Sequence, residues 1–535
     1  MRRVFVLSLV LVLAVCPAAW PSPHAEGEAL AVFRVPEGES VSAASVSVSG
    51  AEVAETYETL SELEGKIFVR VRSSTKTTEE LIAELKQRPD VITASPNYRV
   101  RRQSITETRL PNDPSADLWN IKAIRAPEVW THTTGSRDVY VCIIGSGMYR
   151  HPDLEANIAA DLGLNVSTVS GDYDRSFTSW DVDLMGSGTH EAGTIGAVGN
   201  NGLGVVGINW NVSMFPVRVF DDDEYETISK EIRAMNYLAM LLTKYPDMKL
   251  AAVDVPIYSY FPKTPEEMKD DVYYMAYQAV DNMNRTIIAT GAGYHGIEVG
   301  KPAPFDEEGY FNKGDYVYPA SFTGLKNFIA VGAMASDDTA PYFTNWGDSL
   351  DIAEPGMEIL STYSPVAREE YFPGMYELLD GAVGVHVTGA AVLLKSAYPN
   401  ATASQIKAAL LDSANKDKNP IVYPYTYRVE LAMKRVIREV DEAIADGTIP
   451  AVSRDAEIES RRLEVQERYS HYRQLDGAGR VSRTGLLDVK AAYDLLGERM
   501  RVQESSSSSS GGCSAGYPAV VVLVIISACA LVLKR

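Results

Sequence analysis

The most informative stretch of the sequence is GSGTHEAGTIGAVGNNGLGVVGINWNVSMFPVRVF, at residues 186–220. Within it, GTHEAGTIGAVG (188–199) is rich in small side chains and is typical of a helix start, whereas VSMFPVRVF (212–220) is a nearly continuous apolar run. Such a run without polar alternation indicates a strand that is buried on both faces. A helix followed by a buried strand is typical of proteins that place a parallel sheet between layers of helices.

The same alternation of strands and helices extends over residues 111–415. A long amphipathic helix is expected at 226–245 and an apolar helix at 384–399. Further buried strands are expected at DVYVCIIG (138–145), KLAAVDVPIYS (249–259), RTIIATGAG (285–293) and KNFIAVGAMA (326–335). The sequence therefore predicts an α/β fold with a mostly parallel sheet covered by helices on both faces.

A small module precedes this region, at residues 28–102. KIFVRVR (66–72) alternates as a strand does, TTEELIAELKQRP (77–89) reads as a capped amphipathic helix, and VITASPNYRV (91–100) is a further strand. The pair Arg101 and Arg102 follows at once. Two interpretations of this pair stay open, a cleavage site for a dibasic processing enzyme or a basic patch in a linker.

Both ends of the chain are hydrophobic. Residues 1–25 combine a basic start, an apolar run and small residues, which predicts a secretory signal peptide. A serine- and glycine-rich segment at 501–517 is expected to form a flexible stalk before an apolar membrane anchor at 518–533. A type I transmembrane helix and a GPI signal both fit this anchor. Either one places the protein in the secretory pathway, with its domain on the extracellular or lumenal side of a membrane.

The composition narrows the range of partners. The net charge is −21 and the isoelectric point is about 4.9, so a nucleic acid is not an expected partner. Cys142 lies inside an apolar strand and is expected to be a small buried side chain, which leaves no predicted internal disulfide. Glycosylation is predicted at the sequons of Asn165, Asn211 and Asn400, whereas Asn284 is expected to be too buried.

Residues 416–478 differ from the region before them. Two segments, at 429–447 and 458–475, are charged and helical in pattern, which predicts a helical insertion. The sequence then returns to a globular pattern, so residues 479–500 are expected to complete the main domain.

Several long stretches, in the right order, resemble the subtilisin-like serine protease family, peptidase S8 or the subtilases. Residues 111–130 are similar to the family's lead-in, and VYVCIIGSGMYRHPDL (139–154) to its first core strand and aspartate loop. Residues 186–220 are similar to its catalytic-histidine helix and the following strand. Residues 318–363 match its later sheet region with an A-x-P-G turn, and residues 384–414 match the helix after the nucleophile.

The resemblance implies a subtilisin-like three-layer domain at 108–415, completed at 479–500, and an inhibitory propeptide-like module at 28–102. It also implies that the chain departs from the family where the chemistry occurs. Four positions carry that departure: Gly145 stands for the aspartate, Ser187 for the histidine, Gly381 for the serine and Ala292 for the oxyanion asparagine.

Each replacement removes a chemical function. Gly381 offers no hydroxyl, and the hydroxyl of Ser187 does not titrate near neutral pH, so nucleophile and base are both absent. Gly145 cannot orient a histidine, and Ala292 has no donor for a developing oxyanion, a loss of ~10²–10³ in rate on its own. In subtilisin itself, removal of the whole triad lowers kcat by a factor of ~10⁶.

The family also binds peptide backbone along a strand that reads S-L-G. The matching residues here are Pro256, Ile257 and Tyr258. Proline has no N–H to donate, and Tyr258 adds bulk where the family has glycine, so impaired strand addition is expected.

A rebuilt catalytic site is the less favoured interpretation. His190 and His386 are expected to be packed core histidines, and Asp181, Asp183 and Asp380 to be solvated loop residues. No metal site or cofactor is predicted. Some family members bind calcium, but no D-x-D-x-D-type loop is present, and the acidic residues 221–223 fit a solvated turn better than a cation site.

Three functions remain as hypotheses. The first is a pseudoprotease at a membrane that binds a protein or peptide partner, or its own propeptide-like module. The second is an active serine-type endopeptidase with a non-standard site, and the third is a structural or antigenic surface glycoprotein. A further expectation is that the propeptide-like module stays attached, because the chain cannot cut itself.

Overall fold

The computed structural model describes most of the chain between residues 24 and 508. The described ranges are 24–35, 46–102, 107–108, 118–167, 180–220, 225–304, 309–367, 375–381, 383–445, 448–477 and 479–508.

A seven-stranded sheet forms the centre of the main domain, and its neighbouring strands are all parallel. The strand order is β15-β14-β12-β10-β6-β8-β7. These strands are β6 (Gly135–Gly145), β7 (Leu164–Asn165), β8 (Asn211–Arg218), β10 (Lys249–Val255), β12 (Ile287–Gly291), β14 (Phe328–Met334) and β15 (Ile352–Pro355). The predicted α/β class with a mostly parallel sheet is confirmed.

Strand β6 shows why the apolar runs have no polar alternation. Val141 and Ile143 pack into the core on one face of the sheet, whereas Cys142 and Ile144 pack into the core on the other. The first face carries α6 (Ser187–Gly196), α10 (Val385–Ala397) and α11 (Ala403–Asp412), and the second carries α7 (Ile228–Lys244) and α9 (Val272–Asn282). Cys142 is fully buried and unpaired, as its position in the strand predicted.

The N-terminal module is an antiparallel sheet with two helices. In chain order it contains β1 (His24–Arg34), β2 (Glu52–Thr56), α1 (Glu58–Glu64), β3 (Lys66–Arg72), α2 (Thr78–Lys86) and β4 (Val91–Arg102). The capped helix is confirmed, because Thr77 Oγ1 accepts from Glu80 N at 3.2 Å and Glu80 Oε2 accepts from Thr77 N at 3.0 Å. The first strand begins at His24, ahead of the predicted module start at residue 28.

Shorter elements connect the module and the sheet. They are β5 (Glu107–Thr108), α3 (Trp119–Ala123), α4 (Ala126–Val129), the 3₁₀ turns Glu155–Asn157 and Ala160–Leu162, β9 (Tyr225–Thr227), β11 (Ile257–Phe261), α8 (Pro265–Met268), β13 (Tyr316–Tyr318), β16 (Ile359–Thr362) and β17 (Tyr376–Leu379). The strand expected at 249–259 divides at Pro256, where β10 ends and β11 leaves the sheet.

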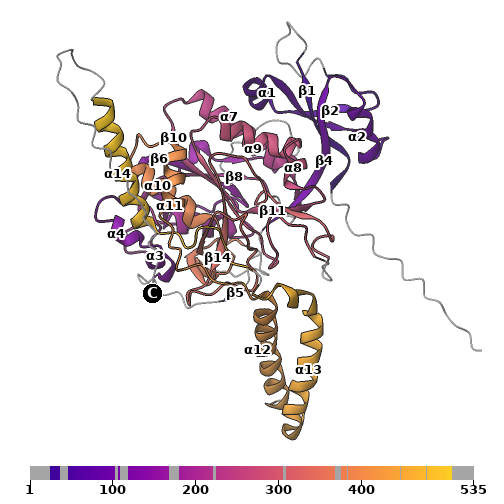
Figure 1. Cartoon of the computed structure of the whole chain (residues 1–535), viewed down its shortest axis with the longest axis vertical. Coiled ribbons are helices and arrows are strands. Elements are labelled where there is room, and N and C mark those ends of the chain that lie inside the picture. Colours follow the sequence, from indigo (N-terminus) through magenta and orange to yellow (C-terminus); the bar gives the residue numbers. More distant parts are fainter. Residues whose placement is uncertain are drawn as a thin grey trace, which may run out of the picture.

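Two long helices, α12 (Pro424–Ala445) and α13 (Arg454–Arg468), form a hairpin that projects from the main domain (Figure 1). The 3₁₀ turns Ala451–Ser453 and Ser470–Leu475 flank α13. After the hairpin the chain returns to the core with α14 (Val489–Ser508). Since α14 continues to Ser508, residues 501–508 of the predicted flexible stalk are helical.

Several predicted segments lie outside the described residues. They are residues 1–23 of the signal peptide, the rest of the stalk, the anchor at 518–533 and the acidic residues 221–223. Among the helices that the structure describes, none combines the length and the apolar character that crossing a membrane requires.

Candidate functional site

The parallel sheet explains where three of the residues named in the sequence analysis lie. Gly145 ends β6, Pro256 follows β10 and Ala292 follows β12. Because the carboxyl ends of parallel strands meet at one edge, these residues lie at the same end of the sheet, where the strand order reverses between β6 and β10. A β-carbon on Gly145 would stand 3.9 Å from Cγ of Pro256.

Ser187, the first residue of α6, lies beside this edge. Its Oγ is 2.9 Å from Oγ of Ser146, and Ser146 Oγ also accepts from Gly188 N at 3.0 Å. Both serines are buried, with 3% and 4% exposure for Ser146 and Ser187. The two neutral hydroxyls therefore form a closed pair at the start of α6.

Gly381 stands just before α10. Its N–H donates to Gly356 O at 2.7 Å, and its φ of 88° is in the left-handed region that favours glycine. The start of α10 is capped by the buried carboxylate of Glu354, which accepts from Gly384 N at 2.6 Å and Val387 N at 2.8 Å. Gly145, Ser187, Ala292 and Gly381 are all buried, and we name this set of four residues the strand-end site.

Besides Glu354, further carboxyl groups near this site are buried, among them Asp183, Asp254 and Asp380. Burial, and to a smaller extent the nearby carboxylate of Glu354, raises the pKa of Asp254 well above its usual range. Burial also raises the pKa of Asp380 to about 6. Asp183 is fully buried and accepts from Gly186 N and Thr189 N, both at 2.8 Å. Asp380 is also buried, and its Oδ1 accepts from Glu358 N at 2.6 Å. The expectation that Asp183 and Asp380 are solvated loop residues is therefore wrong, since both are buried and accept hydrogen bonds from the backbone.

The two histidines are core residues, as predicted. His190 and His386 are fully buried. His190 Nε2 is 2.8 Å from Ile359 O, and burial lowers the pKa of His190 to about 4. His386 Nε2 is 2.9 Å from Nδ2 of Asn120. Neither imidazole pairs with a serine, threonine or cysteine hydroxyl or thiol among the hydrogen bonds of the described residues.

The chain's own strand β4 lies beside β11, the strand that follows Pro256 (Figure 1). On one side it pairs with β11, with Arg102 opposite Ile257 and Arg101 opposite Tyr258. On its other side it pairs with β9, with Arg101 opposite Tyr225. Both edges of β4 are therefore used, which is the arrangement of strand addition.

This pairing changes two expectations. Pairing begins at Ile257, directly after Pro256, and Tyr258 takes part in it, so these residues do not prevent the addition of an extended strand. Arg101 and Arg102 lie within strand β4 and not in a linker. A dibasic processing enzyme would find the backbone of Arg101 paired on both sides and that of Arg102 paired with β11.

The chain continues past the site. After residues 103–106, which lie outside the described ranges, β5 pairs with β17, with Glu107 opposite Leu379 and Thr108 opposite Leu378. Leu379 is two residues before Gly381. The N-terminal module and the main domain are therefore joined by chain that is anchored on both sides of the strand-end site.

Buried polar contacts fix the module in this place. Asn97 is fully buried, and its Nδ2 donates to Glu28 Oε2 at 2.7 Å and to Ser229 Oγ at 3.0 Å, while its Oδ1 accepts from Ser229 N at 2.9 Å. Glu55 pairs with Arg70 within the module and with Arg233 on α7. Because these groups are desolvated, separating the module would leave them unsatisfied.

The sequons differ in their access to solvent. Asn165 is 4% exposed and its Oδ1 accepts from Ser167 N at 2.8 Å, so a glycan has no room there in this fold. Asn211 is half-buried and Asn400 is exposed. Asn284 is also exposed, contrary to expectation. The structure removes Asn165 from the candidate sites and adds Asn284.

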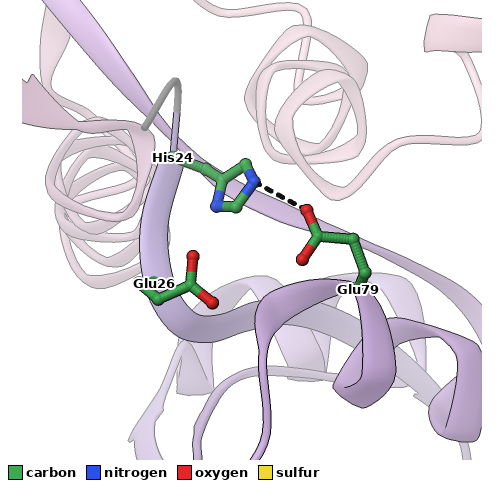
Figure 2. Close-up of side chains that lie close together, drawn as sticks. All are labelled: His24, Glu26 and Glu79. Atoms are coloured by element: carbon green, nitrogen blue, oxygen red, sulfur yellow. Dashed lines mark hydrogen bonds and ion pairs between the residues drawn. The ribbon is translucent and has the colours of Figure 1, made fainter. Parts of the chain in front are cut away.

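One group of possible metal ligands was missed by sequence reasoning. His24, Glu26 and Glu79 point toward one another from β1 and α2, with ligand atoms all within 4.8 Å and His24 Nε2 3.1 Å from Glu79 Oε1 (Figure 2). The pattern H-x-E at 24–26 is the only local signal in the sequence. Since His24 lies inside the predicted signal peptide, cleavage after residue 25 would remove this ligand, so the group carries no assignment.

Fold and site together define an α/β protein in which strand β4 of the N-terminal module pairs with β11, directly after the carboxyl end of β10 in the parallel sheet. The model of the subtilase family, Peptidase_S8, matches residues 136–431, which is more than half of the chain. The protein therefore belongs to the subtilase family.

Relatives of known sequence and structure agree with this assignment. The chain is 24% identical over 427 residues to the thermostable alkaline protease of Halalkalibacterium halodurans, covering 79% of this chain and 95% of the relative. It is 27% identical over 301 residues to subtilisin DY of Bacillus licheniformis, covering 55% and 90%. It is 22% identical over 357 residues to the minor extracellular protease Epr of Bacillus subtilis, covering 66% of this chain but only 46% of that relative.

The fold is also similar to that of fervidolysin from Fervidobacterium pennivorans, a keratinolytic enzyme related to subtilisin. The TM-score is 0.55 with 16% identity, and the match covers 89% of this chain and 62% of fervidolysin. At this identity the likeness concerns the fold alone.

Proposed function

We propose that this protein is a non-hydrolytic member of the subtilase family that acts by binding. The observation that carries the proposal is the strand-end site itself. The positions that the family resemblance assigns to the catalytic residues hold Gly145, Ser187, Ala292 and Gly381, which end or follow strands of the sheet or stand at or just before the starts of α6 and α10. Acyl transfer needs a nucleophile, a base that takes its proton and a donor for the oxyanion, and these side chains supply none of the three.

The surrounding groups do not supply the missing chemistry. The hydroxyl of Ser187 is paired with that of Ser146, and His190 and His386 are bonded inside the core. Asp254 is fully buried, its Oδ1 accepts from Thr388 Oγ1 at 3.2 Å, and burial raises its pKa well above the usual range.

The N-terminal module supports the same proposal. Its strand β4 pairs with both β9 and β11, in the place where relatives that cleave peptides would bind an extended substrate. A module held by buried contacts and never cut away would keep this edge occupied. A partner would then bind elsewhere on the protein. The hydrophobic segments at 1–25 and 518–533 support residence at a membrane surface in the secretory pathway.

Hydrolysis and active-site labelling test the proposal. The purified protein is incubated with casein and with a set of fluorogenic peptides, and separately with a fluorophosphonate probe, beside an active subtilisin as the positive control. We expect no hydrolysis above the buffer blank and no labelling of the chain. Hydrolysis that remains at constant specific activity through two further purification steps would contradict the proposal.

A further inference from the structure

A cavity of about 390 Å³ lies where the α12–α13 hairpin meets the main domain. Four arginines line it, Arg428 and Arg435 from α12 and Arg461 and Arg468 from α13. In each helix the two arginines are seven residues apart, which is two turns and places them on one face. The hairpin therefore directs a double row of guanidinium groups into one space.

Two of these four arginines have no polar or aromatic partner among the residues that the structure describes. Arg461 is paired, with Nη1 3.2 Å from Glu439 Oε2 and Nε 2.9 Å from Glu457 Oε1. Arg435 and Arg468 are exposed and make no hydrogen bond or ion pair with the residues that the structure describes. Glu464 also lines the cavity, so the wall carries four arginines against the two carboxylates Glu439 and Glu464. In a chain of net charge −21 this is a local reversal of sign.

Arg428 is held in place by aromatic rings. Its guanidinium carbon lies 4.1 Å from the ring centre of Tyr472, and 5.7 Å and 5.8 Å from those of Tyr342 and Tyr469. Its Nε is buried and has no acceptor among the described residues. A buried donor without an acceptor is costly, so an oxygen atom of a ligand in the cavity would stabilise this arrangement.

The chemistry of the lining selects the ligand. Planar guanidinium groups bind phosphate and sulfate in a bidentate fashion, and several of them around one space favour a doubly charged anion. Tyrosine rings and Val436 provide apolar walls beside the charges. The volume is in the range of small-molecule sites. We infer that this cavity binds a small ligand that carries a phosphate or sulfate ester. The inference does not depend on the loss of hydrolysis at the strand-end site.

Calorimetric titration with inorganic phosphate and with sulfate tests this inference, at constant ionic strength set with sodium chloride. We expect saturable binding of at least one of the two anions, and the stronger one identifies the ester type. Arg435→Gln and Arg468→Gln should each weaken binding about tenfold, because each removes one charge-assisted contact. Both residues are exposed, so the variants are expected to fold, which circular dichroism checks.

Arg462→Gln is the matched control. Arg462 is an exposed arginine of the same helix, pairs with Glu459 and does not line the cavity. The Arg462→Gln variant loses one positive charge, as Arg435→Gln and Arg468→Gln do, and should bind the anion with the affinity of the natural protein. The inference is overturned if neither anion produces heat beyond the chloride control, or if Arg462→Gln weakens binding as much as Arg468→Gln.

Discussion

The carboxylate atom Oε2 of Glu191 lies 3.6 Å from the point where a β-carbon on Gly145 would stand. Glu191 is 4% exposed and lies one helical turn after Ser187 on α6. The space beside Gly145 thus contains a carboxylate that a different element, α6, holds. Gly145 and Glu191 are neighbours in space, although 46 residues separate them in the sequence.

This relationship predicts how restoration of the triad behaves. The triple variant Gly145→Asp, Ser187→His and Gly381→Ser should remain inactive, because a second buried carboxylate beside Glu191 would keep one of the two protonated. Adding Glu191→Val should raise fluorophosphonate labelling about tenfold or more over the triple variant. Both variants carry the same N-terminal module, so the comparison is matched. Equal labelling of the two would show that Glu191 does not interfere.

Glu231 predicts a pH dependence of stability. It is fully buried on α7, and burial raises its pKa from 4.5 to about 7 despite hydrogen bonds from the hydroxyls of Tyr273 and Tyr277. At a pH between these two pKa values, the Glu231 carboxyl is ionised in the unfolded protein but protonated in the folded protein. Glu231 therefore lowers stability as the pH rises from about 4.5 to about 7.

Glu231→Gln should remove this pH-dependent loss of stability, because glutamine carries no ionisable carboxyl group. In urea unfolding, its stability relative to the natural protein should rise across that window and reach a gain of about 3 kcal/mol above about pH 7. The exposed Glu62→Gln is the control and should show no such change. A difference between Glu231→Gln and the natural protein that is the same at low and neutral pH would rule out this account.

Asn97 predicts how firmly the module is docked. Asn97→Ala removes three hydrogen bonds from a buried contact and leaves groups of Glu28 and Ser229 without this partner. We expect a loss of about 2–4 kcal/mol in unfolding free energy and faster hydrogen exchange of the β4 amides. Asn400→Ala, at an exposed position, serves as the control. Unchanged exchange in β4 would mean that the docking does not depend on this contact.

Access to the sequons predicts the glycan pattern. When the protein is secreted from a eukaryotic cell, peptide mass spectrometry should find glycans at Asn400 and Asn284, both exposed, and none at Asn165. A glycan on Asn165 would require that its buried side chain is released from Ser167.

The sheet was predictable because strands buried on both faces leave long apolar runs such as 138–145. The local signals of the capped helix at 77–89 and of Cys142 were equally direct. The pairing of Arg101 with Tyr258 was not predictable, because it joins strands more than 150 residues apart and depends on how the module docks.

At the strand-end site, the residue identities at 145, 187, 292 and 381 were readable from the sequence. The neighbours that surround them were not. Asp183 appears as a loop aspartate in the sequence, yet the fold buries it as a cap for α6. The cavity of the hairpin likewise needs Tyr342, which lies about 90 residues before the arginines of α12. Such contacts are set by tertiary packing and not by local pattern.

Self-cleavage is the most sensitive test of the central claim, because β4 and β5 hold the chain on both sides of the strand-end site and an attached substrate has a very high effective concentration. The measurement is intact mass over several days for protein made in a protease-free cell-free system. The account predicts that the module and the main domain remain one polypeptide. A new N-terminus within residues 103–106, appearing at a rate independent of protein concentration, would contradict it and show that this fold still cleaves peptide bonds.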